Sequence, residues 1–311
     1  MKIGIIGLGK MGSRIAEKLL KENHQVVVWN RSVEKIEELQ KEIKNSKQGE
    51  LKTAKTIQDL VQQLQKPRVV WSMLPAGETT ENILKEVSKY VQPDDIVIDG
   101  ANSNYKDTQR RFDEFKKQGI KYLGIGVSGG VVAFKTGYPM MAGGDFSAYE
   151  HIKSILDSLA KPHGGHQYFG SGGAGHFVKM VHNGIEYGIM QSLGEGFDVL
   201  KNSSYKLDLL KVAKLWQKGT LVSGFMLDRS VEALEKYPDL EEIEGVVAAS
   251  GEALWTVEAA KEERVPVEII ERSLEYRRRS QTDPKIQKSF TAKMIAAQRN
   301  MFGGHEIKKK H

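Results

Sequence analysis

The chain has 311 residues, of which 40% are hydrophobic and 28% charged, and it contains no cysteine. This length predicts about two domains, and the composition is typical of a globular protein in water. The lack of cysteine excludes disulfides, thiolate nucleophiles and zinc sites with sulfur ligands, and no apolar run approaches the roughly 18 residues that a membrane-spanning helix needs.

The formal net charge of +6 does not come from one basic block. Lys and Arg are mixed with acidic residues along the chain, apart from Arg277-Arg278-Arg279 and a short basic tail. A nucleic-acid partner favours a basic patch with interleaved aromatic residues, so we expect neither nucleic acid nor membrane as a partner. The opening MKIGIIGLG lacks the cationic lead and cleavage site of a signal peptide, and we expect a cytoplasmic protein.

The first element in the chain is a predicted strand over residues 2–6, followed by a glycine-rich turn and a helical pattern from residue 13. This order is typical of a dinucleotide-binding turn in a Rossmann-type sheet. The first glycine would permit a tight turn, the second would let a pyrophosphate lie against the backbone, and the third would let the helix pack closely. The helix would then offer its N-terminal N–H groups to the phosphates. The residues of this glycine turn are Gly7, Leu8, Gly9, Lys10, Met11 and Gly12.

A second predicted strand, residues 25–29, ends in Asn30, Arg31 and Ser32. An NAD site usually places an acidic residue here to bind the ribose 2′-hydroxyl, and this chain has none. A guanidinium and a hydroxyl suit a 2′-phosphate better, which favours NADP as the cofactor and leaves NAD possible. In the alternative interpretation, Arg31 stacks on the adenine without selecting between the two.

Further strands are predicted at residues 68–73, 95–99 and 121–124, with an added strand at 138–142, and helical patterns alternate with them. This alternation predicts an α/β fold with a doubly wound sheet. Ligands bind at the carboxyl ends of such strands, and the last group found there could hold a substrate carboxylate on its backbone N–H groups. The candidate residues at these ends are Leu74, Pro75, Ala76 and Asn102 for the cofactor, and Ser128, Gly129 and Gly130 for the substrate.

Residues 164–175 are rich in glycine and lack apolar periodicity, which predicts a linker or a ligand-lining loop. We therefore divide the chain into a dinucleotide-binding Rossmann domain, residues 1–170, and an all-helical substrate and dimerisation domain, residues 171–311. Helices of the second domain are predicted at residues 176–202, 206–218, 222–235, 250–262, 266–280 and 284–300.

The first of these helices carries an unusual set of polar residues within HFVKMVHNGIEYG, residues 176–188. Their spacing of 0, 3, 4, 7 and 8 places them on one helical stripe, typical of the wall of an active site. The residues of this polar stripe are Lys179, His182, Asn183, Glu186 and Tyr187. A second face is expected to anchor the helix to a core through Val178, Val181, Ile185 and Ile189.

A nicotinamide cofactor can take a hydride from a carbon that bears a hydroxyl, provided that a base removes the hydroxyl proton. Lys179 is the candidate base, because burial and a cationic neighbour lower the pKa of a lysine. A second acid, Glu186, indicates a second step. Oxidation of a hydroxyl β to a carboxylate gives a β-keto acid that loses CO2, and Glu186 could protonate the carbon of the resulting enediol.

The glycine turn, Asn102, the sequence VSGG at residues 127–130 and the pattern KxxHNxxEY at residues 179–187 together resemble the 6-phosphogluconate dehydrogenase family. The length resembles the short bacterial form within the β-hydroxyacid dehydrogenase superfamily. The resemblance implies oxidative decarboxylation of 6-phosphogluconate to ribulose 5-phosphate and CO2, a step of the pentose phosphate pathway and of gluconate utilisation. It also implies that Lys179 acts as base and then as acid, and that Glu186 protonates the enediol carbon.

The resemblance further implies a homodimer or homotetramer in which the C-terminal tail completes a neighbour's site. Met11, Leu74 and Ala76 would flank the nicotinamide. The implied contacts to the sugar acid are Asn102, Ser128, Gly129, Gly130, His182 and Asn183. The implied contacts to its phosphate are Tyr187, Thr256, Arg277, Arg299 and, in the tail, His305.

One position departs from the family, because Leu254 stands where the family has a basic phosphate contact. Either the remaining contacts suffice, or Lys261 or Arg278 compensates, or the substrate differs. The alternatives are therefore a dehydrogenase for a small unphosphorylated β-hydroxyacid, of the 3-hydroxyisobutyrate type, and a noncatalytic protein that binds a cofactor or nucleic acid. No cluster of His, Asp and Glu has metal-ligand spacing, and we expect no metal.

Overall fold

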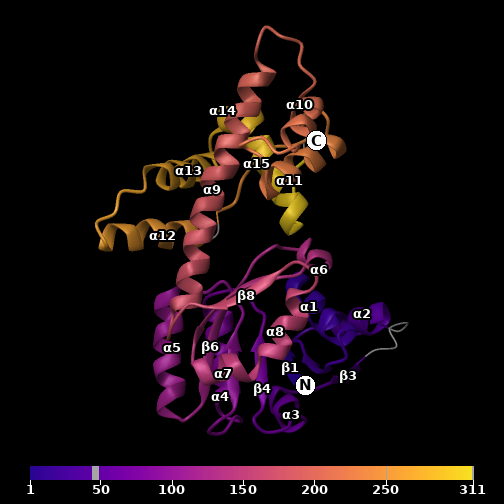
Figure 1. Ribbon diagram of the computed structural model, residues 1–311, viewed down its shortest axis with the longest axis vertical. Coiled ribbons are helices and arrows are strands. Elements are labelled where there is room, and N and C mark those ends of the chain that lie inside the picture. Colours follow the sequence, from indigo (N-terminus) through magenta and orange to yellow (C-terminus); the bar gives the residue numbers. More distant parts are fainter. Residues whose placement is uncertain (44–48, 250, 310–311) are drawn as a thin grey trace. The chain divides into compact units, whose positions relative to one another are not determined.

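The computed structural model describes residues 1–43, 49–249 and 251–309. The chain forms two compact units, Met1–Met180 (unit 1) and Val181–His311 (unit 2), and helix α9 (Ala174–Lys201) contributes residues to both. Figure 1 shows the sheet and the labelled helices. The domain boundary that we placed after residue 170 stays a prediction.

Unit 1 contains an eight-stranded sheet in the order β3-β2-β1-β4-β5-β6-β7-β8. Neighbouring strands from β3 to β6 are parallel, β7 runs antiparallel to β6, and β8 is parallel to β7. The strands are β1 (Lys2–Ile6), β2 (Gln25–Trp29), β3 (Glu50–Thr53), β4 (Val69–Ser72), β5 (Ile96–Asp99), β6 (Lys121–Val127), β7 (Pro139–Gly144) and β8 (Gly165–Tyr168).

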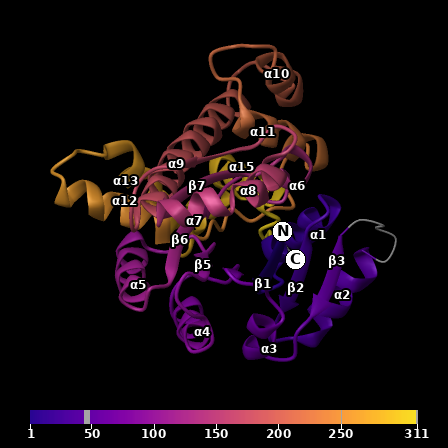
Figure 2. The same ribbon diagram turned by 60° about the horizontal axis from the view of Figure 1, so that its bottom comes forward.

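Helices cover both faces of this sheet. Successive side chains of its inner strands point to opposite faces, and the side chains on both faces are apolar, so each face needs a covering layer. Val26 and Val28 pack with residues of α1, α2, α7 and α8, whereas Val27 packs with residues of α3, α4 and α5. This confirms the predicted doubly wound α/β fold, and the helices around the sheet can be followed in Figure 2. They are α1 (Lys10–Lys21), α2 (Val33–Ile43), α3 (Ile57–Gln62), α4 (Glu78–Ser88), α5 (Tyr105–Lys117), α6 (Ala133–Thr136), α7 (Phe146–His151) and α8 (Lys153–Ala160).

The two outermost strands, β3 and β8, were not predicted from the sequence. The predicted loop over residues 164–175 is wrong at its start, where β8 pairs with β7. The sequence of β8, GHQY, contains no aliphatic side chain. An edge strand needs no buried apolar face, so hydrophobic periodicity does not reveal it.

Unit 2 contains no strand among its described residues, only an isolated bridge between Ile243 and Lys309. Its helices pack around an apolar cluster that includes Phe197, Leu234 and Met294. The predicted helix over residues 284–300 is two helices, because Ser289 ends the first and caps the second by accepting a hydrogen bond from the Ala292 N–H. Residue 250, where a helix was predicted to begin, lies outside the described part of the chain. The helices are α9, α10 (Leu209–Trp216), α11 (Phe225–Lys236), α12 (Gly251–Glu262), α13 (Glu268–Ser280), α14 (Pro284–Lys288) and α15 (Phe290–Gly303).

Helix α9 buries a different face from the one expected to anchor it. Ile185 and Ile189 are 52% and 45% exposed, whereas the polar-stripe residues Asn183 and Tyr187 are buried. The glycines on the helix explain this choice: a Cβ at Gly184 would lie 2.9 Å from Thr256 Cγ2, so the absence of a side chain lets α12 approach the helix. Close backbone packing and polar contacts therefore fix the orientation of α9.

Among the described residues, no helix combines the length and the apolar character needed to cross a membrane.

Candidate functional site

The glycine turn joins β1 to α1 with the geometry that a dinucleotide site requires. Gly7 has φ +96°, and a Cβ there would lie 2.6 Å from the Met73 carbonyl oxygen. A Cβ on Gly12 would lie 2.0 Å from the Gly7 carbonyl oxygen, whereas the space beside Gly9 is open. The first glycine therefore lets the turn lie against the residues that follow β4, the third lets α1 pack against the turn, and the second leaves room for a ligand to approach the backbone.

The end of β2 holds the glycine turn in place through Asn30. Its Oδ1 accepts a hydrogen bond from the Leu8 N–H at 2.9 Å, and its Nδ2 donates to the Ser32 carbonyl at 2.9 Å. Arg31 and Ser32 are exposed beside it. Asn30 thus orients the turn, while the two exposed side chains lie where a Rossmann-type sheet places its contacts to the adenosine ribose.

The candidate residues of unit 1 lie at one edge of the sheet, because β1, β2, β4, β5 and β6 are parallel and adjacent. The strand order reverses direction between β1 and β4, which is the point where such sheets bind ligands. Leu74 after β4 lies against the turn, since its Cδ2 would be 2.7 Å from a Cβ on Gly7. Pro75 and Ala76 are exposed, and Asn102 follows β5.

The residues after β6 were expected to bind a substrate carboxylate through their backbone N–H groups, but not all of these groups are available. The Ser128 N–H donates to the Pro139 carbonyl at 2.9 Å and is committed to the fold. Gly129 and Gly130 have φ +86° and +55°, a conformation that favours glycine, and both are partly exposed.

Lys179 is 5% exposed and lies against β6. A Cβ on Gly126 would lie 2.3 Å from Lys179 Cβ, so only glycine at this strand position allows α9 to approach as it does. The sequence analysis missed Gly126, although a glycine inside a strand often marks the close approach of another backbone.

In unit 2 the polar stripe continues with a hydrogen-bonded chain of three side chains. His182 Nδ1 lies 2.9 Å from Asn183 Oδ1, and Asn183 Nδ2 donates to Glu252 Oε1 at 3.2 Å. Glu252 is buried, and its Oε2 has no hydrogen-bond partner among the described residues. Sequence reasoning missed Glu252, because no motif marks it and α12 brings it to α9 from about seventy residues away along the chain.

Among the described residues of unit 2, the most strongly buried charged side chain is that of Arg277 on α13, which is 2% exposed. Its guanidinium carbon lies 3.2 Å from the centroid of the Tyr187 ring, and a terminal nitrogen donates to the Met190 sulfur at 3.2 Å. Burial lowers the pKa of Arg277 to about 10, and the positive charge of Arg299 acts in the same direction. Burial also lowers the pKa of Arg299. We call Tyr187, Arg277 and Arg299 the arginine cluster; both guanidiniums keep their charge at neutral pH, which makes the cluster a candidate anion site.

The chain matches two family models along most of its length. Residues 2–173 match the NAD binding domain of 6-phosphogluconate dehydrogenase, and residues 175–289 match the C-terminal domain of 6-phosphogluconate dehydrogenase. The chain belongs to the 6-phosphogluconate dehydrogenase family. It is therefore an oxidoreductase of this family with an NAD(P)-binding domain.

Other members of the 6-phosphogluconate dehydrogenase family are similar over most of the chain. The chain is 35% identical to an NAD(+)-dependent, decarboxylating 6-phosphogluconate dehydrogenase of Haloferax volcanii, over 100% of this chain and 99% of that protein. A structure of Plasmodium falciparum 6-phosphogluconate dehydrogenase, described in complex with NADP+ and with 6-phosphogluconate, superposes with a TM-score of 0.82 and 32% identity over 90% of this chain and 62% of that chain. A 3-hydroxyisobutyrate dehydrogenase of Mycobacterium tuberculosis, at 16% identity and a TM-score of 0.70 over 94% of this chain and 97% of that one, shares the fold.

Leu254, where we expected a departure from the family, lies in an apolar setting. Leu254 packs against the apolar cluster that contains Tyr187 and Val257, while Thr256 is buried and donates its hydroxyl hydrogen to the Glu252 carbonyl at 2.9 Å. Lys261 lies on the surface, 3.2 Å from Glu271. Leu254 therefore belongs to the apolar packing of the cluster that contains Tyr187.

The C-terminal tail contacts its own chain among the described residues. The Glu244 N–H donates to the Lys308 carbonyl at 2.9 Å, and Lys308 and Lys309 form ion pairs with Glu244 and Glu242. His305 is exposed, and its ring lies edge-on to Phe302. The expectation that this tail completes a neighbour's site stays a prediction.

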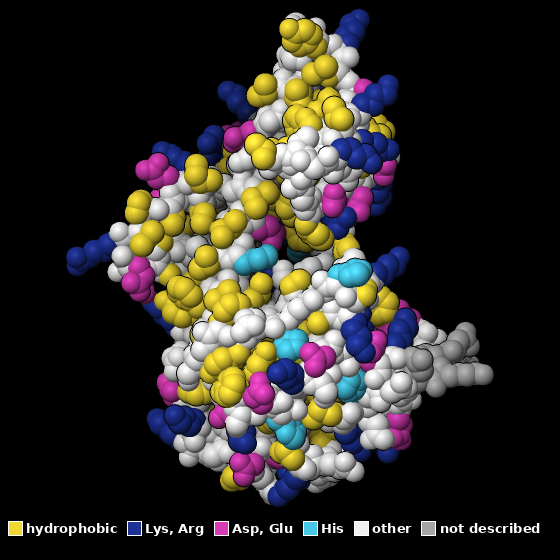
Figure 3. Space-filling model, viewed as in Figure 1, with side chains coloured by type: hydrophobic (Ala, Val, Ile, Leu, Met, Phe, Trp, Pro, Cys, Tyr) yellow, Lys and Arg dark blue, Asp and Glu magenta, His cyan; other side chains and the backbone are white. Residues whose placement is uncertain are grey.

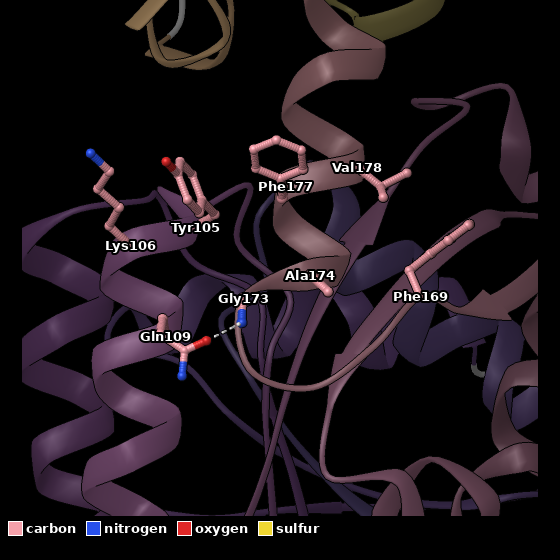
Figure 4. A pocket seen from close by; sticks show the side chains of 8 residues that line it. All are labelled: Tyr105, Lys106, Gln109, Phe169, Gly173, Ala174, Phe177 and Val178. Carbon is pink, nitrogen blue, oxygen red and sulfur yellow. Dashed lines mark hydrogen bonds between the residues drawn. The ribbon is translucent and has the colours of Figure 1, made fainter. Parts of the chain in front are cut away.

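A pocket of about 500 Å³ lies in unit 1 beside α5 and the start of α9 (Figure 4). The rings of Tyr105 and Phe177, which both line it, meet edge to face with 5.0 Å between their centroids. None of the predicted site residues lines it. Its lining consists of Tyr105, Lys106, Gln109, Phe169, Gly173, Ala174, Phe177 and Val178.

On the face drawn in Figure 3, basic and acidic side chains are interspersed. Within residues 1–43, 49–249 and 251–309, no three His, Asp or Glu side chains are grouped so that they could hold a metal ion. The expected absence of a metal stays a prediction.

Proposed function

We propose that the protein catalyses the oxidative decarboxylation of 6-phosphogluconate to ribulose 5-phosphate and CO2, with reduction of NADP. The observation that carries this proposal is the buried Arg277, whose guanidinium lies over the Tyr187 ring and belongs to one cluster with Arg299. Two permanently charged guanidiniums in a buried setting favour a doubly charged anion such as a phosphate. A small acid without phosphate would leave this cluster without a ligand.

In the first step, Lys179 would remove the proton of the substrate's C3 hydroxyl. A bound dinucleotide would supply the acceptor for the hydride of the same carbon. Lys179 as a whole residue is 5% exposed. Burial of an amine favours its neutral form, which is the form that can accept a proton. The product of this step is a β-keto acid.

In the second step, the bond between C2 and the carboxylate breaks, CO2 leaves, and the electron pair moves toward the ketone. Lys179 would return its proton to the ketone oxygen, which gives an enediol. Glu186 would then protonate the enediol carbon. Both side chains project from the continuous helix α9, and seven residues of an α-helix span about 10 Å, a separation compatible with two proton transfers on different atoms of one sugar acid.

The remaining candidate residues would bind and orient the substrate and the cofactor. Ser128, Gly129 and Gly130 would hold the sugar acid together with Asn102, His182 and Asn183, and Thr256 would assist at the phosphate. The open space beside Gly9 fits a pyrophosphate against the backbone, whereas a side chain at that position would obstruct it.

We propose NADP as the preferred cofactor and NAD as a possible one. The exposed Arg31 and Ser32 at the end of β2 favour a 2′-phosphate. The relatives differ on this point, since the Haloferax volcanii protein is named NAD(+)-dependent, whereas NADP+ is named as the cofactor of the Plasmodium falciparum enzyme. Replacement of Arg31 by Ala should therefore lower the ratio of kcat/KM with NADP to kcat/KM with NAD by about tenfold, the loss of one charge-assisted contact. An unchanged ratio would contradict the selection of NADP by Arg31.

The second candidate is a dehydrogenase for a small unphosphorylated β-hydroxyacid. The observation that favours it is the apolar Leu254, because the family's basic phosphate contact is missing there.

One assay separates the two candidates. NADP reduction and CO2 release are followed with 6-phosphogluconate, gluconate and 3-hydroxyisobutyrate as parallel substrates. The proposal expects kcat/KM for 6-phosphogluconate to exceed that for gluconate by at least about 100-fold, the range expected for two charged hydrogen bonds, with one CO2 per NADPH. Equal kcat/KM values for 6-phosphogluconate and gluconate, or hydride transfer without release of CO2, would contradict the proposed function.

We also propose a homodimer or homotetramer. The exposed apolar side chains of α9 and α13, Ile185, Ile189 and Ile269, support this proposal because a second copy could cover them. The molar mass from light scattering, measured at low micromolar concentration, tests it, and a mass of 34.8 kDa would contradict it.

A further inference from the structure

The carboxylate of Asp99, the last residue of β5, is fully buried and binds both sides of one short turn. Oδ1 accepts a hydrogen bond from the Ala101 N–H at 3.0 Å, and Oδ2 accepts one from the Ser103 hydroxyl at 2.9 Å. The Ser103 N–H closes the turn on the Ala101 carbonyl at 2.8 Å. Asn102 lies between the two donors, so Asp99 fixes the backbone before and after it.

The carboxylate itself is held by a framework from three other elements. Arg111 on α5 donates to Asp99 Oδ2 at 2.9 Å and to Glu81 on α4 at 2.9 Å. Tyr122 on β6 donates its hydroxyl hydrogen to the same Oδ2 at 3.2 Å. Because Arg111 and Tyr122 are both buried, these contacts are shielded from water, and the carboxylate has little freedom to rotate.

The turn presents an acceptor atom that the fold leaves without a partner. Asn102 Oδ1 is buried and has no hydrogen-bond partner among the described residues. A buried acceptor without a partner is unfavourable, and such an atom is often explained by a missing ligand. The sequence analysis placed Asn102 among both the cofactor contacts and the substrate contacts, but it assigned no role to Asp99.

We propose that Asp99 is a positioning residue: it holds the turn of residues 101–103 so that Asn102 meets the dinucleotide and the substrate with its side chain already oriented. Arg111 and Glu81 supply the charges that keep the Asp99 carboxylate in place. The inference rests on the proposed function in one respect, namely that Asn102 binds the dinucleotide and the substrate. The hydrogen bonds of Asp99 do not depend on the reaction.

Two variants that each remove one donor to Asp99 Oδ2 provide the test. Ser103→Ala removes the donor that belongs to the turn, and Tyr122→Phe removes a donor that does not. A positioning role predicts that S103A raises the Kd of NADP, measured by titration without substrate, by about threefold to tenfold, the effect of one hydrogen bond. It predicts a smaller rise of this Kd for Y122F, because Arg111 still donates to the same Asp99 oxygen and the turn keeps its own donor, while the Tm of Y122F falls at least as far as that of S103A. Equal changes of Kd in both variants would overturn the proposal.

A double-mutant cycle with Asn102→Ala separates positioning from general stability. If the Ser103 hydroxyl acts through the Asn102 side chain, S103A should have no further effect on the Kd of NADP once Asn102 is alanine. Additive effects of the two substitutions would contradict the proposal. Asp99→Asn should have a larger effect, since its amide would donate toward Arg111, and S103A keeps the test decisive if that variant does not fold.

These binding measurements also distinguish the inference from the proposed function. If wild-type protein binds NADP but does not oxidise 6-phosphogluconate, the proposed function fails, and the S103A result still decides the role of Asp99. If the wild-type protein oxidises 6-phosphogluconate and S103A binds NADP normally, the positioning role fails and the proposed function remains.

Discussion

The glycine turn of unit 1 and the arginine cluster of unit 2 are candidate anion sites of two different kinds. The turn offers backbone N–H groups at a helix N-terminus, and the six residues that form it are consecutive in the chain. The cluster offers side-chain charge, and its members come from α9, α13 and α15, more than one hundred residues apart at the extremes.

This difference determines how each site responds to substitution. A backbone site depends on the shape of the chain, so it is sensitive to added side-chain atoms at Gly7 or Gly12. A side-chain site depends on the identity of the charged group and on the ring or helix that supports it.

The largest effect should come from Lys179→Ala, which removes the proposed base and leaves both anion sites intact. We expect kcat to fall by about 100-fold to 10,000-fold, which is the usual contribution of a general base. The Kd of NADP should stay within about twofold of the wild-type value. Lys201→Ala is the matched control, because Lys201 is an exposed residue at the end of the same helix. Stopped-flow NADPH formation measures the hydride step. A Lys179→Ala variant with normal turnover would remove the chemical basis of the proposed function.

Arg277→Lys should break the side-chain site and leave the backbone site unaffected. Lysine keeps the charge but loses the planar group that lies on Tyr187 and the capacity for bidentate binding. We expect the KM for 6-phosphogluconate to rise by about tenfold to 100-fold, with an unchanged Kd for NADP.

Arg278→Lys is the control for this prediction, since Arg278 is the next residue along α13 and is exposed. It should behave as wild type. If Arg277→Lys raises the Kd of NADP as much as the KM of the sugar acid, the assignment of the cluster to the substrate phosphate is wrong.

A smaller effect is expected from Gly126→Ala, which tests whether the sheet sets the position of Lys179. The new methyl group would lie 2.3 Å from Lys179 Cβ, so the helix or the strand must shift. A displacement approaching 1 Å can cost up to about 100-fold in rate, and we expect a fall in kcat of about tenfold. The pH dependence of kcat should change with it, because the surroundings of the amine change.

Gly196→Ala is a matched control for this substitution, since a Cβ at that position of α9 meets no atom within 4 Å. Alanine favours a helix over glycine, so this variant should keep its activity and gain stability. Equal kinetics for the two variants would show that Gly126 does not position Lys179.

The contrast between the two sites also explains how far the sequence could predict them. Strands β1 and β2 were predicted at their observed bounds, because each is a short apolar run next to a recognisable turn. Strand β8 was missed because its GHQY sequence has no apolar pattern, and α9 was predicted to bury the wrong face. Periodicity identifies the faces of a helix, but which face is buried depends on the partners, here the Thr256 side chain that packs on Gly184.

Among the site residues, those in contiguous motifs were available to sequence reasoning and those assembled by the fold were not. Asn30, Lys179 and Asn183 each belong to a local pattern. Glu252 and Asp99 act through hydrogen bonds to distant or buried partners, and nothing in their immediate sequence marks them. The roles of all these residues stay predictions until they are measured.

The smallest effect concerns the framework behind Asp99, and it should appear as a dependence of stability on pH. Hydrogen bonds from Arg110, together with those from Arg111, lower the pKa of Glu81 from 4.5 to about 2. A carboxyl group with a lowered pKa in the folded state stabilises the fold above its unfolded pKa, and this contribution is lost as the pH falls from about 4.5 toward 2.

We therefore expect Glu81→Gln to reduce the free energy of unfolding in urea at pH 6 more than at pH 3. Glu114→Gln is the control, because Glu114 also pairs with Arg110 but is exposed, and exposed pairs contribute little. If Glu81→Gln is as destabilising at pH 3 as at pH 6, the Glu81 charge does not support Arg111. The Asp99 carboxylate, and with it the turn that carries Asn102, would then be held by hydrogen bonds without a contribution from the Glu81 charge.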